Sequence, residues 1–239
     1  MKLITLCFIP CCESKRPAIT AKPIRDPWYH YLGINVSSLI RGRQEMVDSL
    51  IKSSIPTNAI DLYTGNFYRP LDKEIIKNQI DAGKIRLFII SAGYGLVDAN
   101  EQIHNYDETM TSRTARIWRD IGLVNIIAEV IQIFKADQVF GFFSGNPVWN
   151  YSGSKYRFFF SEGLKTALAN GYDPINAGCF YRAAGKGQST IPTALGKCFM
   201  DALRADYSKD LLNKMHKNDL PYSQELPITI KYESFVRWV

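Results

Sequence analysis

The chain has 239 residues, of which 46% are apolar and 22% charged, and this composition suits a globular protein with a sizeable core. Its 29 Lys and Arg against 23 Asp and Glu give a net charge of +6, which fits nucleic-acid binding and equally a plain solubility charge. No apolar run approaches the roughly 18 residues of a membrane span, and the short apolar start lacks a signal-peptide cleavage site. We therefore expect a cytoplasmic protein.

The cysteines and histidines are too scattered to predict a metal site or a disulfide framework. Among the five cysteines only Cys11 and Cys12 are adjacent, and no C-x-x-C pair occurs. A reducing compartment fits this usage. Cys11 or Cys12 could act as a nucleophile with His104 as base, although a buried, inert cysteine is the commoner case. We expect neither a metal nor a cofactor.

The apolar periodicity predicts strands that alternate with helices along the chain. The expected strands cover residues 3–9, 59–63, 85–90, 138–143 and 173–177, with a further edge strand at 228–232. The expected helices cover residues 37–52, 67–82, 113–135, 155–170 and 192–207, with Ser112 capping the third and Gly122 as a potential break in it. This alternation predicts a three-layer α/β fold, with a mostly parallel central sheet and helices on both faces. We expect one domain over residues 1–210, with 211–239 as a C-terminal extension packed on it.

The strand at 85–90 leads into the segment with the strongest functional signal. Its nearly continuous apolar run is typical of a strand covered on both faces. It ends in SAGYG, residues 91–95, and a polar stretch then continues to a helix start near Thr111. Such a connection exceeds the usual length of about 2–6 residues. Open α/β sheets place ligands at the carboxyl ends of strands, whereas a plain surface loop with glycines at its turns is the alternative.

Polar segments follow all five expected strands of the alternating part. In chain order they are CCESK, TGN, SAGYG with HNYDE, SGN, and GCFYRAAGKG. A parallel sheet would gather them at one edge, where glycines, hydroxyls and helix N-termini suit phosphate or another anion. The basic side chains available there are Lys15, Arg16, Lys155, Arg182 and Lys186. Singly, each is more simply a solvated surface cation.

Two side chains are candidates for catalysis. Asp107 follows Tyr106 and precedes a helix start, so it could orient or deprotonate a water, stabilise a cationic sugar, or merely cap the local turn. Asn146, in a Gly-Asn-Pro turn, could place a water. Aromatic rings in these loops, such as those of Tyr94, Tyr106 and Trp149, could stack on a base. No nucleotide-binding fingerprint and no G-x-S-x-G elbow is present.

Several short motifs resemble those of the YaaA-like group of bacterial proteins. They are IPCCESK, LYTGNF, IISAGYGLV, YDETM and GSKYR, in this order along the chain. The similarity covers roughly residues 3–164 and continues weakly to 203. It omits the tail after Tyr207 and the insert around Trp28.

The resemblance implies an α/β fold like that of uracil-DNA glycosylases, and contact with DNA. Relatives of this broad kind resemble antiphage enzymes that remove modified bases from viral DNA. By this resemblance the pocket comprises Cys12, Ser14, Lys15, Ser91, Gly93, Tyr94, Gly95 and Asp107. The uracil-glycosylase signature G-Q-D-P-Y is absent, and SGNPVW only loosely resembles the G-x-N-P element of mismatch-specific relatives.

The resulting hypothesis is a DNA glycosylase that removes a modified base, such as a glucosylated hydroxymethylated cytosine, from phage DNA and leaves abasic sites. Catalysis is assigned to Asp107 and Asn146. Substrate binding is assigned to Cys12, Ser14, Lys15, Thr64, Ser91, Gly93, Tyr94, Gly95, Tyr106, Ser144, Lys155 and Arg182. The alternatives are a YaaA-like DNA-binding stress protein without catalysis and a hydrolase of small nucleosides or nucleotides. DNA is the expected partner, with no membrane and no obligate protein partner.

Overall fold

A central sheet organises the computed structural model. The structure describes residues 3–19, 28–31, 36–47, 55–145, 155–187, 189–217, 220–221 and 228–236. In this part of the chain the sheet has seven strands in the order β4-β3-β1-β6-β7-β9-β8. They are β1 (Thr5–Pro10), β3 (Ile85–Ser91), β4 (Gly95–Asp98), β6 (Gln138–Phe143), β7 (Asn176–Ala184), β8 (Leu220–Pro221) and β9 (Thr229–Ser234). Two short strands, β2 (Thr57–Asn58) and β5 (Gln102–Ile103), pair separately.

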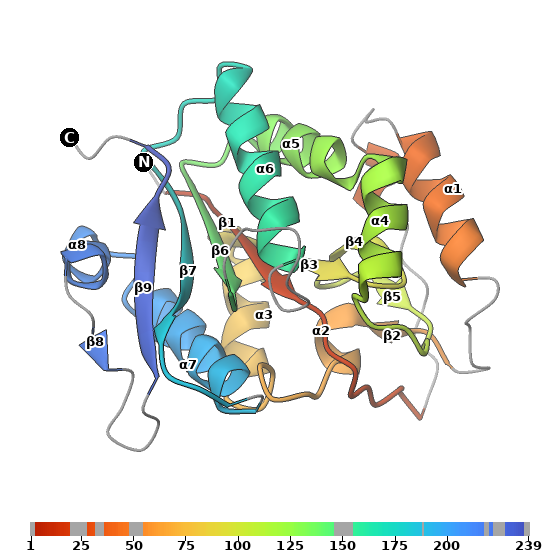
Figure 1. Ribbon diagram of the computed structural model, residues 1–239, viewed down its shortest axis with the longest axis horizontal. Coiled ribbons are helices and arrows are strands. Elements are labelled where there is room, and N and C mark those ends of the chain that lie inside the picture. Colours follow the sequence, from red (N-terminus) through yellow and green to blue (C-terminus); the bar gives the residue numbers. More distant parts are fainter. Residues whose placement is uncertain are drawn as a thin grey trace.

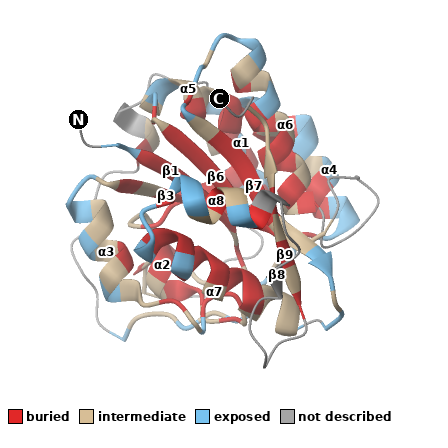
Figure 2. Ribbon diagram, turned by 90° about the vertical axis from the view of Figure 1, so that its left-hand side faces the viewer, coloured by how far each residue is buried: buried red, intermediate tan, exposed pale blue. Residues whose placement is uncertain are grey.

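The centre of the sheet is parallel and both of its sides are antiparallel. β1 runs parallel to β3 and to β6, with Thr5 opposite Ile85 and Gln138, and β6 runs parallel to β7. β4 and β9 are antiparallel to β3 and β7. β1, β3 and β6 are buried along almost their whole length (Figure 2), as their continuous apolar sequences predict. These three strands confirm the predicted ones closely.

Helices cover both faces of the sheet (Figure 1). On one face lie α1 (Val36–Val47), α4 (Ser112–Ile121), α5 (Leu123–Phe134) and α6 (Lys155–Ala169). On the other lie α2 (Ala59–Leu62), α3 (Lys73–Asp81) and α7 (Thr190–Arg204), while α8 (Lys209–Lys217) packs beside β9. The short helix η1 (Trp28–Tyr31) precedes α1. The predicted α/β fold with two helical layers is confirmed. No helix in the described ranges is long and apolar enough to cross a membrane.

The expected helix over 113–135 divides at Gly122, as its glycine suggested. Gly122 has φ +95°, a left-handed conformation that ends α4 and begins α5. The predicted cap was wrong by one residue. Thr111 caps α4, because its side-chain oxygen accepts a hydrogen bond from the Thr114 N–H.

Two predicted elements on the amino-terminal side of β3 were wrong. The expected strand at 59–63 is the short helix α2, because a brief apolar run fits a buried helical turn as well as a buried strand. The expected helix from 67 begins only at Lys73, where Asp72 accepts a hydrogen bond from the Ile75 N–H. Residues 66–70 before it form turns.

The carboxyl-terminal third also differs from expectation. The weak strand expected at 173–177 is β7, which extends to Ala184 and contains most of the segment predicted as a polar loop. β9 confirms the strand expected at 228–232, but it pairs with β7 on one side and β8 on the other. The predicted C-terminal extension therefore supplies strands to the sheet itself.

Candidate functional site

The candidate site lies where β1 and β3 end. These strands are parallel and in register from Thr5 and Ile85 onward, so the segments that leave them emerge side by side. The CCESK segment then runs along the residues that follow α2. The Thr64 N–H donates to the Ser14 carbonyl over 3.0 Å, and Lys15 forms an isolated β-bridge with Tyr63. The structure thus brings the first two predicted polar segments together.

The predicted long loop after β3 was wrong, because the chain turns back at once as a hairpin. Ser91 pairs with Gly95, and β4 continues antiparallel to β3. A Cβ atom on Gly93 would lie 2.7 Å from the Tyr106 ring, and one on Gly95 would lie 2.5 Å from the Trp118 ring. The glycines therefore make room for rings from later in the chain, and both are buried.

Three hydroxyls form a buried hydrogen-bonded triangle beneath this hairpin. The Tyr63 and Tyr106 hydroxyls lie 2.8 Å apart, and the Ser91 hydroxyl lies 2.9 Å from Tyr106 and 3.3 Å from Tyr63. Ser91 also accepts from the Tyr94 N–H over 3.0 Å. Burial raises the pKa of both Tyr63 and Tyr106 well above the ordinary value, so both phenols are neutral at physiological pH. The triangle, which we call the floor, is rigid and uncharged.

Lys15 lies on this floor. Its Nζ atom is 4.0 Å from the centroid of the Tyr106 ring and donates to the Glu13 carbonyl over 3.2 Å. Burial lowers the pKa of Lys15, and this effect is opposed by Cys11, Cys12, Asp107 and Glu13. Asp107 is exposed at the rim and close enough to act electrostatically on Lys15. The structure therefore places an amine and a carboxylate from distant segments within electrostatic range of each other.

The adjacent cysteines face different partners. The Cys11 thiol is hydrogen-bonded to the Tyr156 hydroxyl at 3.1 Å. The Cys12 thiol donates to the Ser14 carbonyl and accepts from the Gly65 N–H over 3.2 Å. Burial raises the pKa of Cys12 to about 11, so it is a thiol at neutral pH. These contacts do not support the idea of a Cys12 nucleophile activated by a base.

The predicted stacking residues lie deeper than expected. Tyr94 and Tyr106 are buried and pack edge to face, with ring centroids 5.4 Å apart. The His104 N–H donates to the Tyr94 hydroxyl over 3.1 Å. Both rings thus belong to the core rather than to an exposed surface. Asn146 and Trp149 lie outside the described residues.

The first turn of α6 contacts the start of α4, the segments after β1 and β6, and β9. Lys155 is 1% exposed, and its Nζ donates to the Ser112 hydroxyl over 3.0 Å, which ties α6 to the start of α4. Desolvation lowers its pKa. Tyr156 contacts Cys11, as described, and Arg157 binds the Gly145 carbonyl and Glu233. The predicted binding residue Lys155 is thus a buried structural side chain beside the site.

The other predicted binding residues are more dispersed. Ser14 is exposed and Thr64 half-buried next to it. Ser144 is half-buried immediately after β6. Arg182 lies in β7 and donates over 3.1 Å to the carbonyl of Gly185, just past the end of its own strand.

Sequence reasoning gave no role to Tyr63 or Arg157. Tyr63 belongs to the floor, and Arg157 is a buried cation that lies 3.9 Å from the centroid of the Tyr181 ring. The signal for both was the motif that contained them, LYTGNF and GSKYR. Locally, the only sign that Tyr63 or Arg157 has a role is that each carries polar atoms within an otherwise apolar or helical run.

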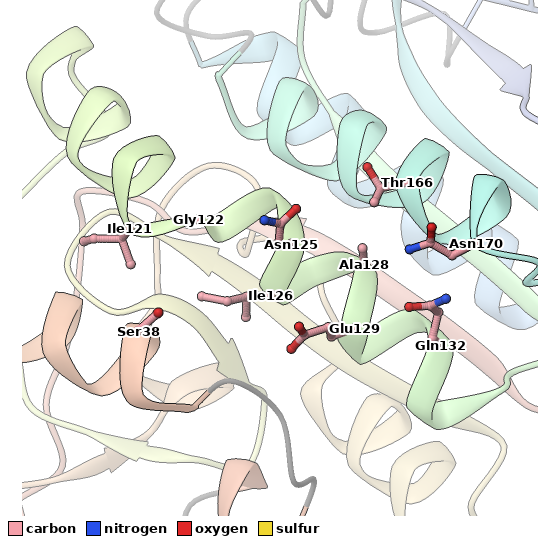
Figure 3. A pocket seen from close by; sticks show the side chains of 10 residues that line it. All are labelled: Ser38, Ile121, Gly122, Asn125, Ile126, Ala128, Glu129, Gln132, Thr166 and Asn170. Carbon is pink, nitrogen blue, oxygen red and sulfur yellow. The ribbon is translucent and has the colours of Figure 1, made fainter.

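A separate pocket of about 200 Å³ lies along α5, between α1 and α6 (Figure 3). Ser38 comes from α1, Thr166 comes from α6, and most of the remaining lining side chains come from α5. None of the predicted site residues lines it. The pocket therefore does not add to the carboxyl-edge site.

Comparison with known proteins gives a family but no activity. A search of curated proteins found no match. The model of a family of unknown function, DUF6884, matches residues 49–178, which is more than half of the 239-residue chain. The matched region includes Tyr63, Ser91, Tyr106 and Asp107, whereas Lys15 precedes it. The chain therefore belongs to the DUF6884 family.

Proposed function

We propose that the protein is a DNA glycosylase that hydrolyses the N-glycosidic bond of a modified base in phage DNA and leaves abasic sites. The observation that carries the proposal is the position of Lys15 on the floor formed by Tyr63, Ser91 and Tyr106, within electrostatic range of the exposed Asp107 carboxylate. The amine comes from the segment after β1 and the carboxylate from the segment after β5.

This pair suits the charges that develop during base removal. Breaking the N-glycosidic bond places positive charge on the sugar and negative charge on the departing base. The Asp107 carboxylate, exposed at the rim, can stabilise the sugar cation or orient the attacking water. The Lys15 ammonium can stabilise the departing base or a backbone phosphate. Lys15 is partly accessible on the neutral tyrosine floor and Asp107 is exposed, so a base turned out of the duplex could reach both.

Two further observations support the proposal. The motifs that surround the site resemble those of YaaA-like proteins, and the mixed sheet with a parallel centre is compatible with a uracil-DNA-glycosylase-like arrangement. The surplus of basic residues, +6 overall, suits a phosphate backbone. Removal of a modified base by such an enzyme would serve antiviral defence.

The test uses phage DNA that carries glucosylated hydroxymethylcytosine, with unmodified phage DNA alongside. Abasic sites are counted with an aldehyde-reactive probe and the released base by mass spectrometry. We expect abasic sites only in modified DNA, and Asp107→Asn to lower their rate by about 100-fold or more. Asp120→Asn is the matched control, because Asp120 is an exposed carboxylate on α4.

The outcome also separates the alternatives. Tight, salt-dependent DNA binding without base release by the wild-type protein would refute the glycosylase and favour a non-catalytic DNA-binding protein. Release of a base from free nucleosides but not from DNA would favour a small-molecule hydrolase.

A further inference from the structure

The backbone around Lys15 is held firmly, so its amine has a defined place. The Arg16 N–H donates to the Leu62 carbonyl over 2.7 Å, and the Thr64 N–H donates to the Ser14 carbonyl over 3.0 Å. These bonds flank the bridge between Lys15 and Tyr63. The side chain then extends over the Tyr106 ring and remains partly accessible.

The charge environment of Lys15 differs from that of an ordinary surface lysine. Within the described ranges, no carboxylate lies at ion-pair distance from its Nζ, which contacts a carbonyl and aromatic rings instead. Lys77 shows the ordinary case, since its Nζ lies 3.0 Å from the Asp61 carboxylate. Partial burial opposes protonation of Lys77, but Asp61 prevails and raises its pKa, whereas burial lowers the pKa of Lys15.

An amine without a tight ion pair is suited to covalent chemistry. A lysine becomes a nucleophile when it loses its proton, and desolvation favours that loss. A paired lysine such as Lys77 is held in its charged form, which cannot attack a carbonyl. Lys15 combines the desolvated setting with access to the rim where Asp107 lies.

We propose that Lys15 Nζ forms an imine with the aldehyde of an abasic deoxyribose in DNA and then cleaves the strand on its 3′ side. The inference rests on the proposed function for its substrate, because base removal is the reaction that creates this aldehyde. It adds a second activity, a lyase step, to the same site.

The steps balance without an added oxidant or reductant. The neutral amine attacks C1′ of the open-chain sugar, and loss of one water leaves the C=N bond of the imine. A base then removes a proton from C2′, and the C3′–O bond breaks so that the 3′ phosphate departs with its electron pair. Asp107 is an exposed carboxylate within electrostatic range of Lys15, as is Glu13, and we assign it the role of accepting the proton. Water finally hydrolyses the imine and regenerates the free amine.

The experiment uses the full-length protein and a duplex oligonucleotide that already contains an abasic site, so that base removal is bypassed. Sodium borohydride reduces the imine to a stable bond, and the adduct is measured on a denaturing gel. We expect a trapped adduct with wild-type protein, located at Lys15 by peptide mapping. Lys15→Arg should reduce the adduct at least about 10-fold, because a guanidinium is not a nucleophile. Lys165→Arg, on an exposed face of α6, should leave it unchanged.

The possible outcomes separate this inference from the proposed glycosylase. An adduct mapped to another lysine, or one that persists in a folded Lys15→Arg variant, would overturn the inference. Absence of any adduct in wild-type protein that generates abasic sites from modified DNA would also overturn it, while the glycosylase would stand. An adduct at Lys15 in a protein that releases no base would support the inference and refute the glycosylase. Circular dichroism shows whether the variant is folded.

Discussion

Two cations lie past strand ends of the same sheet, and they are held in opposite ways. Beyond β6, Arg157 is 3% exposed and binds Glu233 of β9 at 2.5 Å, with the Gly145 carbonyl as a second partner. Beyond β1, Lys15 rests on an aromatic ring and reaches only a carbonyl among its described hydrogen-bond partners. The paired arginine fastens α6 to β9, whereas Lys15 is the residue to which we assign a chemical role. In the proposed mechanism, the lack of a tight ion pair among the described residues distinguishes Lys15 from the structural cation Arg157.

The largest expected effect concerns the hairpin that shapes the Lys15 region. Gly95→Ala should lower the free energy of unfolding by about 3 kcal/mol, because the new methyl group meets Trp118 and the backbone is left-handed there, with φ +70°. Gly83→Ala is the matched control, since Gly83 has φ +64° but open space around it, and should cost about 1 kcal/mol. Urea denaturation measures both. Equal losses would show that backbone strain alone requires Gly95.

Removing each of the two cations in turn tests whether Arg157 contributes more to stability than Lys15 does. Arg157→Met should lower the free energy of unfolding by about 2 kcal/mol, which is less than for a fully buried pair because Glu233 is 43% exposed. Lys15→Met should change it by less than about 1 kcal/mol, since no described residue forms an ion pair with Lys15. Thermal and urea unfolding of both variants test this. A larger loss for Lys15→Met would mean that Lys15 is the structural cation.

A smaller effect is expected from the floor beneath Lys15. Tyr106→Phe should lower the free energy of unfolding by about 1 kcal/mol, because Ser91 and Tyr63 keep each other as partners at 3.3 Å. The ring that supports Lys15 remains, so trapping of the abasic sugar should persist. Unfolding and borohydride trapping of the same preparation measure the two effects. Loss of trapping at unchanged stability would give the Tyr106 hydroxyl a direct role in the chemistry.

The smallest expected effect is the change with pH of the borohydride-trapping rate at Lys15 and of the stability of the fold. Because burial lowers its pKa from the usual 10.5, the neutral amine forms at lower pH than in an exposed lysine, and the trapping rate should rise with pH through a midpoint below 10.5. The folded state favours neutral Lys15, so its protonation opposes folding at low pH. That destabilisation disappears as pH rises through the folded pKa toward 10.5. A trapping midpoint at or above 10.5 would contradict a desolvated amine.

Sequence patterns predicted the elements whose character is local. β1, β3 and β6 have near-continuous apolar runs, and the break at Gly122 needed only a glycine within a helical pattern. The prediction of a strand at 59–63 was wrong because an apolar run of that length fits a helical turn as well as a strand. The prediction of a long loop after β3 was wrong because β4 is a strand through its pairing with β3, which its own sequence does not indicate.

At the site, too, local features were predicted from the sequence, whereas most contacts between distant residues were not. The motif resemblance already placed Asp107 and Lys15 in one pocket, but nothing in the sequence indicated that Tyr63 would join Tyr106 and Ser91. The glycines of SAGYG were expected at turns, and Gly95 does adopt a left-handed conformation with φ +70°. What the sequence did not indicate is that both glycines also leave space for the rings of Tyr106 and Trp118.

By itself, the sequence determined the α/β class, the buried central strands and the residue types at the carboxyl edge, because these follow from periodicity and composition along the chain. Only the tertiary structure decided which of those residues meet. The parallel register of β1 and β3 sets the segment that carries Lys15 beside the hairpin. There the amine lies over the Tyr106 ring, and no described carboxylate lies at ion-pair distance from it. Whether a cation has an ion-pair partner depends on which residues are its neighbours in space, and the sequence order does not specify those neighbours.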